Sequence, residues 1–421
     1  MVTTQSLLAL FLVLKFCQHL IERGLSALNR RHYLNPDHQA EAVKYLGISQ
    51  EDLQKTLNYS KDKYWFGKVT DWVQIIVLII FIGMGGLGWI EKLAIQLSLD
   101  LPIKPLSIGL VFFGIISFIS FLFSLPFDYY FNFVIEEKHG FNRQKPKEFF
   151  KDKLKGLLIG MILGGILLIL LLYIMQNMGK NWWVYGWITF SAFSVFTMLI
   201  YPSLIAPLFN KFNPLPEGEL KEKILDLSKR VNFRTNGLFV MDASKRSSHG
   251  NAYFTGIFGK KRIVLFDTLV NMLNTNQVVA VLAHELGHFK LHHIRWGMIR
   301  EILFSGLLFY ILSLCLPLEI FYKAFSFEGV SNYAALVVFG LWFGPIELFL
   351  KPIRSSISRK NEFSADRFAT NQVGNWKDLG EGLLKLREKS RSMPISHPLF
   401  SLFYHSHPPI LERLKVLSHA G

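Results

Sequence analysis

The chain has 421 residues, of which 51% are hydrophobic and 14% aromatic, and its mean hydropathy is +0.29. A soluble domain usually has a lower apolar content, so this composition predicts a membrane protein. The formal net charge of +15 fits either nucleic-acid binding or the excess of cytoplasmic Lys and Arg in membrane proteins, and the hydropathy favours the second. Cys17 and Cys315 both lie in apolar runs, which excludes a disulfide framework and argues against a Cys-based zinc site.

Seven segments are apolar enough to cross a hydrocarbon core of about 30 Å, which needs about 20 helical residues. They lie at residues 6–20, 72–90, 106–125, 157–175, 183–204, 302–320 and 334–350. The first segment lacks a basic start and a small-residue cleavage site, so we predict a retained membrane helix rather than a cleaved signal. The chain is therefore predicted to be a mainly α-helical polytopic membrane protein.

Lys and Arg alternate between the loops that connect these segments. Residues 21–71 hold eight and residues 129–156 hold seven, whereas 91–105 hold two, 176–182 one and 321–333 one. By the positive-inside rule, the odd-numbered loops and the C-terminal tail face the cytoplasm. Most of the extramembrane mass is then predicted to be cytoplasmic.

Four regions follow from this division of the chain. Membrane helices one to five with their loops occupy 1–204, a catalytic region 205–301, membrane helices six and seven 302–350, and a helical region 351–421. The second region is predicted to be α+β. It contains a helix at 219–230, strands within 237–242 and 252–267, a hairpin turn at Gly259–Lys260, and a long helix from about Asn276.

The long helix carries the sequence VVAVLAHELGHFKLHH. Positions i and i+4 share one helix face, so His284 and His288 are able to bind one metal ion together. In this H-E-x-x-H pattern the two imidazoles hold zinc and Glu285 is the general base that activates the attacking water. The bare pattern also occurs by chance on amphipathic helices. Here the preceding face is apolar, and Gly287 is expected to leave room beside the metal.

A catalytic zinc usually has three protein ligands and one open position. The segment SRKNEFSADRFA supplies Glu362 as a candidate third ligand, with Ala365 allowing a close helix contact. Asp366 lies four residues further on and would orient a zinc-bound His through its second ring nitrogen. Taken alone, Glu362 is better explained as a solvated surface residue, and the zinc pattern on the long helix is what favours a ligand. His292 and His293 have unsuitable spacing and are predicted to be interfacial residues ahead of the next membrane helix.

Several longer blocks carry a family resemblance. They are SSHGNAYFTGIFGKKRIVLFDTL upstream of the HELGH sequence, FVIEEKHGFN at 133–142, APLFNKFNPLPEG at 206–218 and SHPPILERL at 406–414. Together with HELGH and the distant E-x-x-x-D, the sequence resembles the type I CAAX prenyl proteases, which are integral membrane zinc peptidases. The blocks extend along nearly the whole chain.

The resemblance implies seven helices that enclose a chamber within the membrane, with a zincin-like catalytic domain and one Zn²⁺ at its cytoplasmic end. It also implies the reaction, which removes the last three residues of a prenylated Cys-a-a-X peptide. The expected partners are that peptide and the lipid bilayer, without nucleic acid. The expected location is the bacterial inner membrane or the endoplasmic reticulum membrane, depending on the organism.

The resemblance also implies roles for further residues. Asn251 and Ala252 match an edge strand that hydrogen-bonds the substrate backbone, although Asn251 also fits a turn before a strand. His249 and Tyr253 lie in the same block and are weaker candidates for substrate contact.

The block near the C-terminus supplies two more candidates. His407 matches a residue that faces the zinc and stabilises the tetrahedral oxyanion, with helix capping before Pro408 as the alternative. Arg413 would pair either with an acidic group beside the ligands or with the substrate carboxylate.

Two other functions compete with this one. A membrane quality-control zinc protease would share the zinc pattern but act on misfolded membrane proteins, and such enzymes generally lack the IEEKHGFN and PLFNKF blocks. A noncatalytic binding protein or transporter would have no need of Glu285 as a base. Nucleic-acid binding ranks last because no basic–aromatic module is present.

Overall fold

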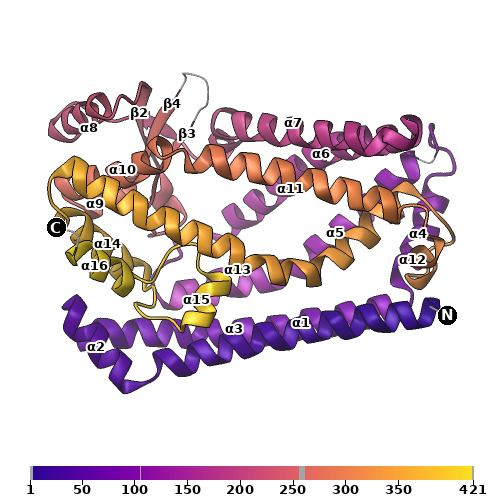
Figure 1. Ribbon diagram of the computed structural model, residues 1–421, viewed down its shortest axis with the longest axis horizontal. Coiled ribbons are helices and arrows are strands. Elements are labelled where there is room, and N and C mark those ends of the chain that lie inside the picture. Colours follow the sequence, from indigo (N-terminus) through magenta and orange to yellow (C-terminus); the bar gives the residue numbers. More distant parts are fainter. Residues whose placement is uncertain (1–2, 105, 256–260, 420–421) are drawn as a thin grey trace.

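The structure is a computed structural model that describes residues 3–104, 106–255 and 261–419. Seven of the described helices are long and apolar enough to cross a membrane, which agrees with the predicted number. They run side by side along the long axis of the molecule (Figure 1). These helices are α1 (Thr4–Tyr33), α3 (Gln50–Gly83), α5 (Leu106–Tyr130), α6 (Pro146–Asn177), α7 (Trp182–Ile200), α11 (His293–Cys315) and α13 (Asn332–Val373).

Short elements connect the long helices at both ends. Ser49 begins α3 by accepting a hydrogen bond from the amide of Asp52, as an N-cap residue does. Gly47 ends the preceding helix in the left-handed conformation at φ 64°. The connecting elements are α2 (Pro36–Leu46), α4 (Gly86–Leu97), η1 (Phe131–Glu136), η2 (Gly179–Asn181), η3 (Tyr201–Ile205), η4 (Ala206–Leu208) and α12 (Glu319–Ala324).

Two of the predicted membrane segments end earlier than expected. The second was predicted at 72–90, but α3 ends at Gly83 and Gly85 adopts φ 76°, so the chain turns before α4 begins. The sixth was predicted at 302–320, but α11 ends at Cys315. Pro317 follows two residues later and is unable to continue an α-helix. In both cases the apolar run is longer than the helix, because the residues beyond the break pack in the short helices α4 and α12.

The four-stranded sheet has the order β1-β2-β4-β3. Its strands are β1 (Phe212–Pro214), β2 (Thr235–Met241), β3 (Ala252–Thr255) and β4 (Lys261–Phe266). β2 and β4 are parallel, while β1 and β3 pair antiparallel at the two edges. The antiparallel pairing of β3 with β4 fits the expected hairpin, whose turn at Gly259–Lys260 lies outside the described residues.

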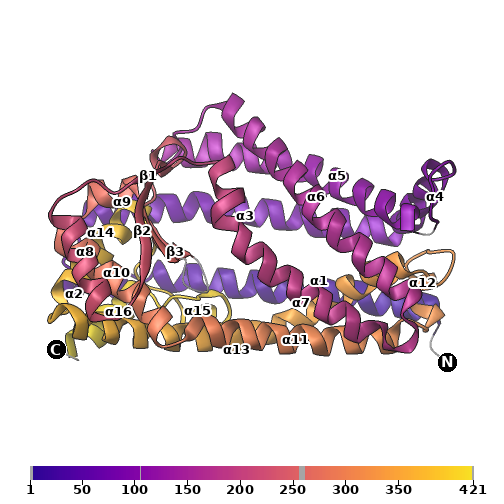
Figure 2. The same ribbon diagram turned by 90° about the horizontal axis from the view of Figure 1, so that it is seen from above.

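One face of the sheet packs on α10 (Thr275–Lys290), which carries the HELGH sequence. The buried side chains of this face, among them Leu238, Ala252 and Leu265, share one apolar core with that helix. Helices α8 (Glu219–Arg230), α14 (Lys377–Ser390) and α16 (Ile410–His419) complete the core, and α8 has the predicted boundaries. The remaining elements are η5 (Ala243–Lys245), α9 (Asp267–Met272) and α15 (Pro398–Tyr404). This α+β unit lies at one end of the long helices (Figure 2).

The seventh membrane helix and the segment with Glu362 are parts of one helix. α13 continues over 42 residues and includes both Pro345 and Pro352, so the boundary expected between 350 and 351 lies inside it. The boundary expected between 301 and 302 similarly lies inside α11. The membrane helices therefore extend directly into the catalytic region.

Charged side chains line a cavity of about 640 Å³ between α1, α3, α13 and α15. Arg23 and Asp71 form an ion pair there at 2.6 Å, and Lys351 pairs with Glu22 at 2.9 Å. Ionisable residues in membrane helices are costly unless they face protein or water and pair with one another. The pairs indicate a polar interior between the helices, although the full extent of the expected chamber stays a prediction.

Candidate metal centre

Helix α10, which carries His284 and His288, is largely buried in the core. Asn274 caps the helix by accepting from the amide of Gln277, and the Gln277 side chain accepts from the Asn274 amide. The following residues from 278 to 284 are buried. A helix fixed by burial on this scale holds the imidazoles of His284 and His288 in defined positions.

Helix α13 brings the third candidate ligand to this pair. α10 and α13 approach closely because Gly287 faces Ala365, and a Cβ atom on Gly287 would lie 3.2 Å from both the Cα and the carbonyl oxygen of Ala365. Gly287 was expected to leave room beside the metal. The structure corrects that expectation, since the absent side chain makes space for α13, which carries Glu362 and Asp366.

The side chains of His284, His288 and Glu362 converge at one point. The Nε2 atoms of the two histidines are 3.2 Å apart. The Glu362 carboxylate lies 3.4 Å from Nε2 of His284 and 3.1 Å from Nε2 of His288. Among the described residues these three form the group whose donor atoms all lie within 4.8 Å of one another, a set that could hold a metal ion.

Asp366 and Arg413 lie behind His284. Asp366 accepts from Nδ1 of His284 at 2.7 Å. Arg413 donates to the same carboxylate at 2.8 Å from Nε and 2.5 Å from a terminal nitrogen. Both side chains are buried. Arg413 was expected to pair either with an acidic group beside the ligands or with the substrate carboxylate. In the structure its partner is the acidic group, Asp366.

The contacts of His284 show that a proton or a metal ion must lie among the donor atoms of the cluster. Because Nδ1 donates its hydrogen to Asp366, the lone pair of Nε2 faces the Glu362 carboxylate and the second imidazole. Electron-rich atoms repel one another at such distances unless a proton or a metal ion lies among them. Burial alone would lower the pKa of His284, but Asp366 and Glu362 outweigh it and raise the pKa to about 9. The donor set of two imidazoles and one carboxylate fits a catalytic zinc site.

Glu285 lies next to the first imidazole in the sequence and is half-buried. Burial raises the pKa of Glu285, while His284 and His288 oppose that shift. Within the described residues its carboxylate makes no hydrogen bond or ion pair. A carboxylate with a raised pKa, whose oxygens accept no other hydrogen bond from the described residues, is suited to take a proton from a neighbouring water.

His407 also reaches the cluster. Its Nδ1 atom lies 2.8 Å from the Glu362 carboxylate, yet 65% of the side chain is exposed. The residue precedes Pro408 and α16, and it contacts Glu362 rather than serving only as a cap. Its exposed ring thus lies beside the group formed by His284, His288 and Glu362.

Comparisons with known proteins identify the family. Residues 29–211 match the model of the CAAX prenyl protease N-terminal domain with five membrane helices, and residues 214–420 match peptidase family M48. The CAAX prenyl protease 1 homolog of Arabidopsis thaliana is 38% identical over 375 residues, covering 88% of each chain. The human homolog is 32% identical, covering 96% of this chain and 94% of its own.

The crystal structure of S. mikatae Ste24p superimposes with a TM-score of 0.89 at 33% identity, over 97% of this chain and 98% of the other. The chain belongs to the type I CAAX prenyl protease family. Members of peptidase family M48 are zinc metalloproteases, and the chain is an integral membrane metalloprotease of that family.

Sequence reasoning missed one side chain at the family's metal site. His293 was predicted to be an interfacial residue ahead of the next membrane helix, and it does begin α11, but its Nδ1 atom also lies 3.0 Å from Nδ1 of His288. Its Nε2 atom is 3.3 Å from Oγ of Ser364 on α13. The cause is the left-handed conformation of His292 at φ 60°, which turns the chain between α10 and α11. A helix break of this kind leaves no signal in i, i+4 spacing.

The predicted substrate-binding residues occupy two different places around the sheet. Ala252 begins the edge strand β3, and Asn251 precedes it with its side chain accepting from the Ala252 amide at 2.8 Å. His249 instead stacks on Phe141 with ring centroids 4.7 Å apart and lies 3.5 Å from the Glu136 carboxylate. The structure therefore does not bring His249 to the metal group.

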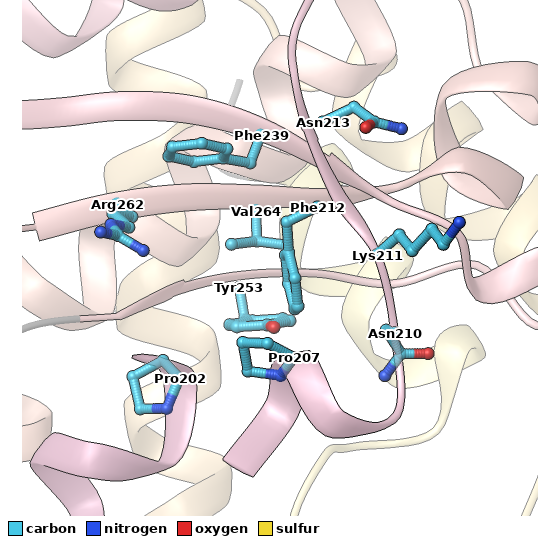
Figure 3. Close-up of a pocket in the computed structure, with 10 residues that line it drawn as sticks. All are labelled: Pro202, Pro207, Asn210, Lys211, Phe212, Asn213, Phe239, Tyr253, Arg262 and Val264. Carbon is cyan, nitrogen blue, oxygen red and sulfur yellow. The ribbon is translucent and has the colours of Figure 1, made fainter. Parts of the chain in front are cut away.

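Tyr253 lies on the sheet face that points away from α10. It lines a pocket of about 510 Å³ together with Phe212, Phe239, Pro202 and Pro207 (Figure 3). The alternation of side chains along β3 explains this position, because its neighbour Ala252 faces the core with α10. The side chain of Tyr253 is thus separated by the sheet from the helix that bears His284.

Proposed function

We propose that the protein is a zinc endopeptidase that removes the last three residues from prenylated Cys-a-a-X peptides at the cytoplasmic face of a membrane. The observation that carries the proposal is the convergence of His284, His288 and Glu362, with Glu285 beside them, at the end of seven membrane helices. The names of the similar proteins, CAAX prenyl protease 1 and its homologs, support the substrate class.

His284, His288 and Glu362 would hold one Zn²⁺, which when bound lowers the pKa of a water and polarises the scissile carbonyl. Asp366 fixes the ring orientation and tautomer of His284 through the 2.7 Å contact with Nδ1. Arg413 forms an ion pair with Asp366, so the buried carboxylate behind His284 does not stay uncompensated. The expected ligands and their supporting residues thus form a consistent set.

Glu285 acts as the general base in this proposal. Its carboxylate takes the proton of the attacking water and passes it to the nitrogen of the leaving peptide. The raised pKa favours the first transfer, because a more basic carboxylate takes up the proton more readily. His407 donates a hydrogen bond to the developing oxyanion from the open side of the cluster.

The substrate peptide would pair with β3, the exposed edge of the sheet. The carbonyl oxygen of Asn251 accepts from the amide of Phe266 on β4, so the main-chain groups of the next residue, Ala252, point away from β4 in an antiparallel ladder. The carbonyl of Ala252 would accept from an added strand, and its amide would donate to that strand once released from the Asn251 side chain, which accepts from it at 2.8 Å. We keep Ala252 as the main-chain contact, with Asn251 and Tyr253 as its neighbours along the chain and His249 as a residue of the neighbouring rim.

The cytoplasmic orientation rests on the distribution of Lys and Arg described above. Prenylated tails are presented from the cytoplasmic side, so the orientation fits the substrate. The membrane would be the bacterial inner membrane or that of the endoplasmic reticulum, according to the organism.

The experiment is digestion of a farnesylated Cys-a-a-X peptide by the purified chain, with the products identified by mass spectrometry. We expect release of the C-terminal tripeptide, and no release when a zinc chelator is added. An unprenylated membrane protein serves as the competing substrate. Cleavage of that protein with the farnesylated peptide left intact would favour the quality-control function instead.

A further inference from the structure

Three segments without acidic residues meet where α10 turns into α11. They are 231–241, 261–266 and 286–300. Arg234, Lys261, Lys290 and Arg295 lie at this corner, Arg262 lies next to Lys261 on the opposite face of the sheet, and Arg300 lies further along α11. We refer to Arg234, Lys261, Arg262, Lys290 and Arg295 as the corner patch. No part of the metal site or of the proposed substrate strand uses them.

Contacts between the segments hold the patch together. Thr235 on β2 pairs with Lys261 on β4, which places Arg234 beside the start of β4. The ammonium group of Lys261 lies 3.8 Å from the ring centroid of Phe289 and 5.0 Å from that of Phe233. Burial lowers the pKa of Lys261, and the cations Arg295 and Lys290 lower it further. Like charges are therefore close enough here to oppose one another.

None of the five cations forms an ion pair with a carboxylate in the part of the chain that the structure describes. Some cations elsewhere on the same cytoplasmic unit are paired. On α8, Lys223 pairs with Glu219 at 2.7 Å and Arg230 with Asp226 at 3.0 Å. The corner patch is thus a concentrated positive charge whose counter-ion must come from outside the chain.

The patch is continuous with the part of the protein that lies in the membrane. The membrane helix α11 begins at His293, and its first turns expose Ile294 by 44% and Trp296 by 58%. Trp is enriched where a helix crosses the membrane–water interface. Figure 3 shows Arg262 beside Pro202, which belongs to η3 at the end of the fifth membrane helix. The cations therefore lie beside the ends of two membrane helices.

We propose that the corner patch binds the headgroups of anionic phospholipids in the adjoining membrane leaflet. Clusters of Lys and Arg next to a membrane helix attract anionic lipids, each cation contributing a few-fold in affinity. The exposed Trp296 and Ile294 contact the acyl region while the cations contact phosphate. A soluble polyanion would gain nothing from these apolar side chains. Bound lipid would hold the sheet, with its edge strand β3, against the membrane surface.

The test uses the full-length protein in neutral detergent. Dioleoyl phosphatidylserine or dioleoyl phosphatidylcholine is titrated in, and bound lipids are counted by native mass spectrometry. The variant is Lys261→Gln/Arg262→Gln/Arg295→Gln. The control, Lys229→Gln/Lys377→Gln/Lys389→Gln, removes the same charge from exposed cations of the cytoplasmic unit that form no ion pair with any described residue. Because Lys261 packs on two aromatic rings, Arg262→Gln/Arg295→Gln is the second variant, which changes exposed residues alone.

Wild type and control are expected to bind phosphatidylserine in preference to phosphatidylcholine. The triple variant is expected to bind it at least about fivefold more weakly, with the double variant in between. Equal phosphatidylserine binding by the double variant and the control would overturn the proposal, as would equal binding of the two lipids by wild type. Glycerophosphoserine has the same headgroup but no acyl chains. If it competes at the same concentration as the lipid, the patch binds a soluble anion, and this result would also overturn the proposal.

Discussion

Arg413 and Asp366 form a buried ion pair through two hydrogen bonds, directly behind the imidazole of His284. Asp366 is 1% exposed and Arg413 is 7% exposed. Removing one partner of such a pair leaves an uncompensated charge in the interior. The pair therefore joins α16 to α13 and controls the orientation of a proposed metal ligand.

Replacement of Arg413 by alanine is expected to lower the free energy of unfolding by about 3–5 kcal/mol, because Asp366 then stays buried without its cation. Thermal unfolding in detergent measures the change. Arg230→Ala is the matched control. It breaks the exposed pair with Asp226 and should cost no more than about 1 kcal/mol. Equal losses in the two variants would contradict the role of the buried pair.

Gly287→Ala tests the close approach of α10 and α13. A Cβ atom at this position would meet Phe368 at 3.1 Å and Ala365 at 3.2 Å, so the helices must separate slightly and Glu362 moves away from the two histidines. We expect a loss of about 1–3 kcal/mol in stability and a lower zinc content by elemental analysis. In Gly382→Ala the nearest atom lies at an ordinary 3.5 Å, and that variant should keep its zinc.

The sequence predicted most of the helical framework because its signals are local. The boundaries of α8 and the start of α10 to within one residue follow from short-range patterns of charge and hydrophobicity. The i, i+4 spacing also brought Glu362 and Asp366 to one face of α13. The early end of α3 was missed because the apolar run continues into α4. β1 was missed because three residues carry too little pattern, and its pairing depends on β2 from a distant part of the chain.

At the metal site, too, local sequence patterns were predicted correctly and features that depend on the tertiary structure were missed. His284, His288 and Glu362 were predicted as a set, and the structure brings their donor atoms together. The position of His293 depends on a single left-handed residue, His292, which spacing does not reveal. The orientation of Tyr253 away from α10 depends on strand register, and a shift of one residue would reverse it.

His407→Ala is expected to lower kcat by about 10²–10³-fold on a prenylated peptide, with a smaller change in KM and with zinc retained. The expectation follows from a hydrogen bond made to the oxyanion in the transition state and not to the bound substrate. Steady-state kinetics with elemental analysis provide the measurement. His405→Ala removes a ring that contacts Ser401 at 2.9 Å and should have little effect on kcat. A change confined to KM would mean that His407 only binds substrate.

Methylation of single amide nitrogens in the substrate tests pairing with β3. An added strand donates from alternate residues to one neighbour. We therefore expect KM to rise by roughly three- to tenfold, the contribution of one hydrogen bond, at every second methylated position and to stay unchanged between them. Peptides differing only in the methylated position give the comparison. A uniform effect at all positions would be inconsistent with strand addition at Ala252.

The most direct test of the central claim is Glu285→Gln, with zinc content and cleavage of a farnesylated Cys-a-a-X peptide measured on the same sample. The amide keeps the size of the side chain but is unable to accept the proton of water. We predict about one zinc per chain in both proteins, and a loss of cleavage in the variant by at least about 10²-fold. Undiminished cleavage by the variant, or wild-type protein that cleaves without zinc, would contradict the account.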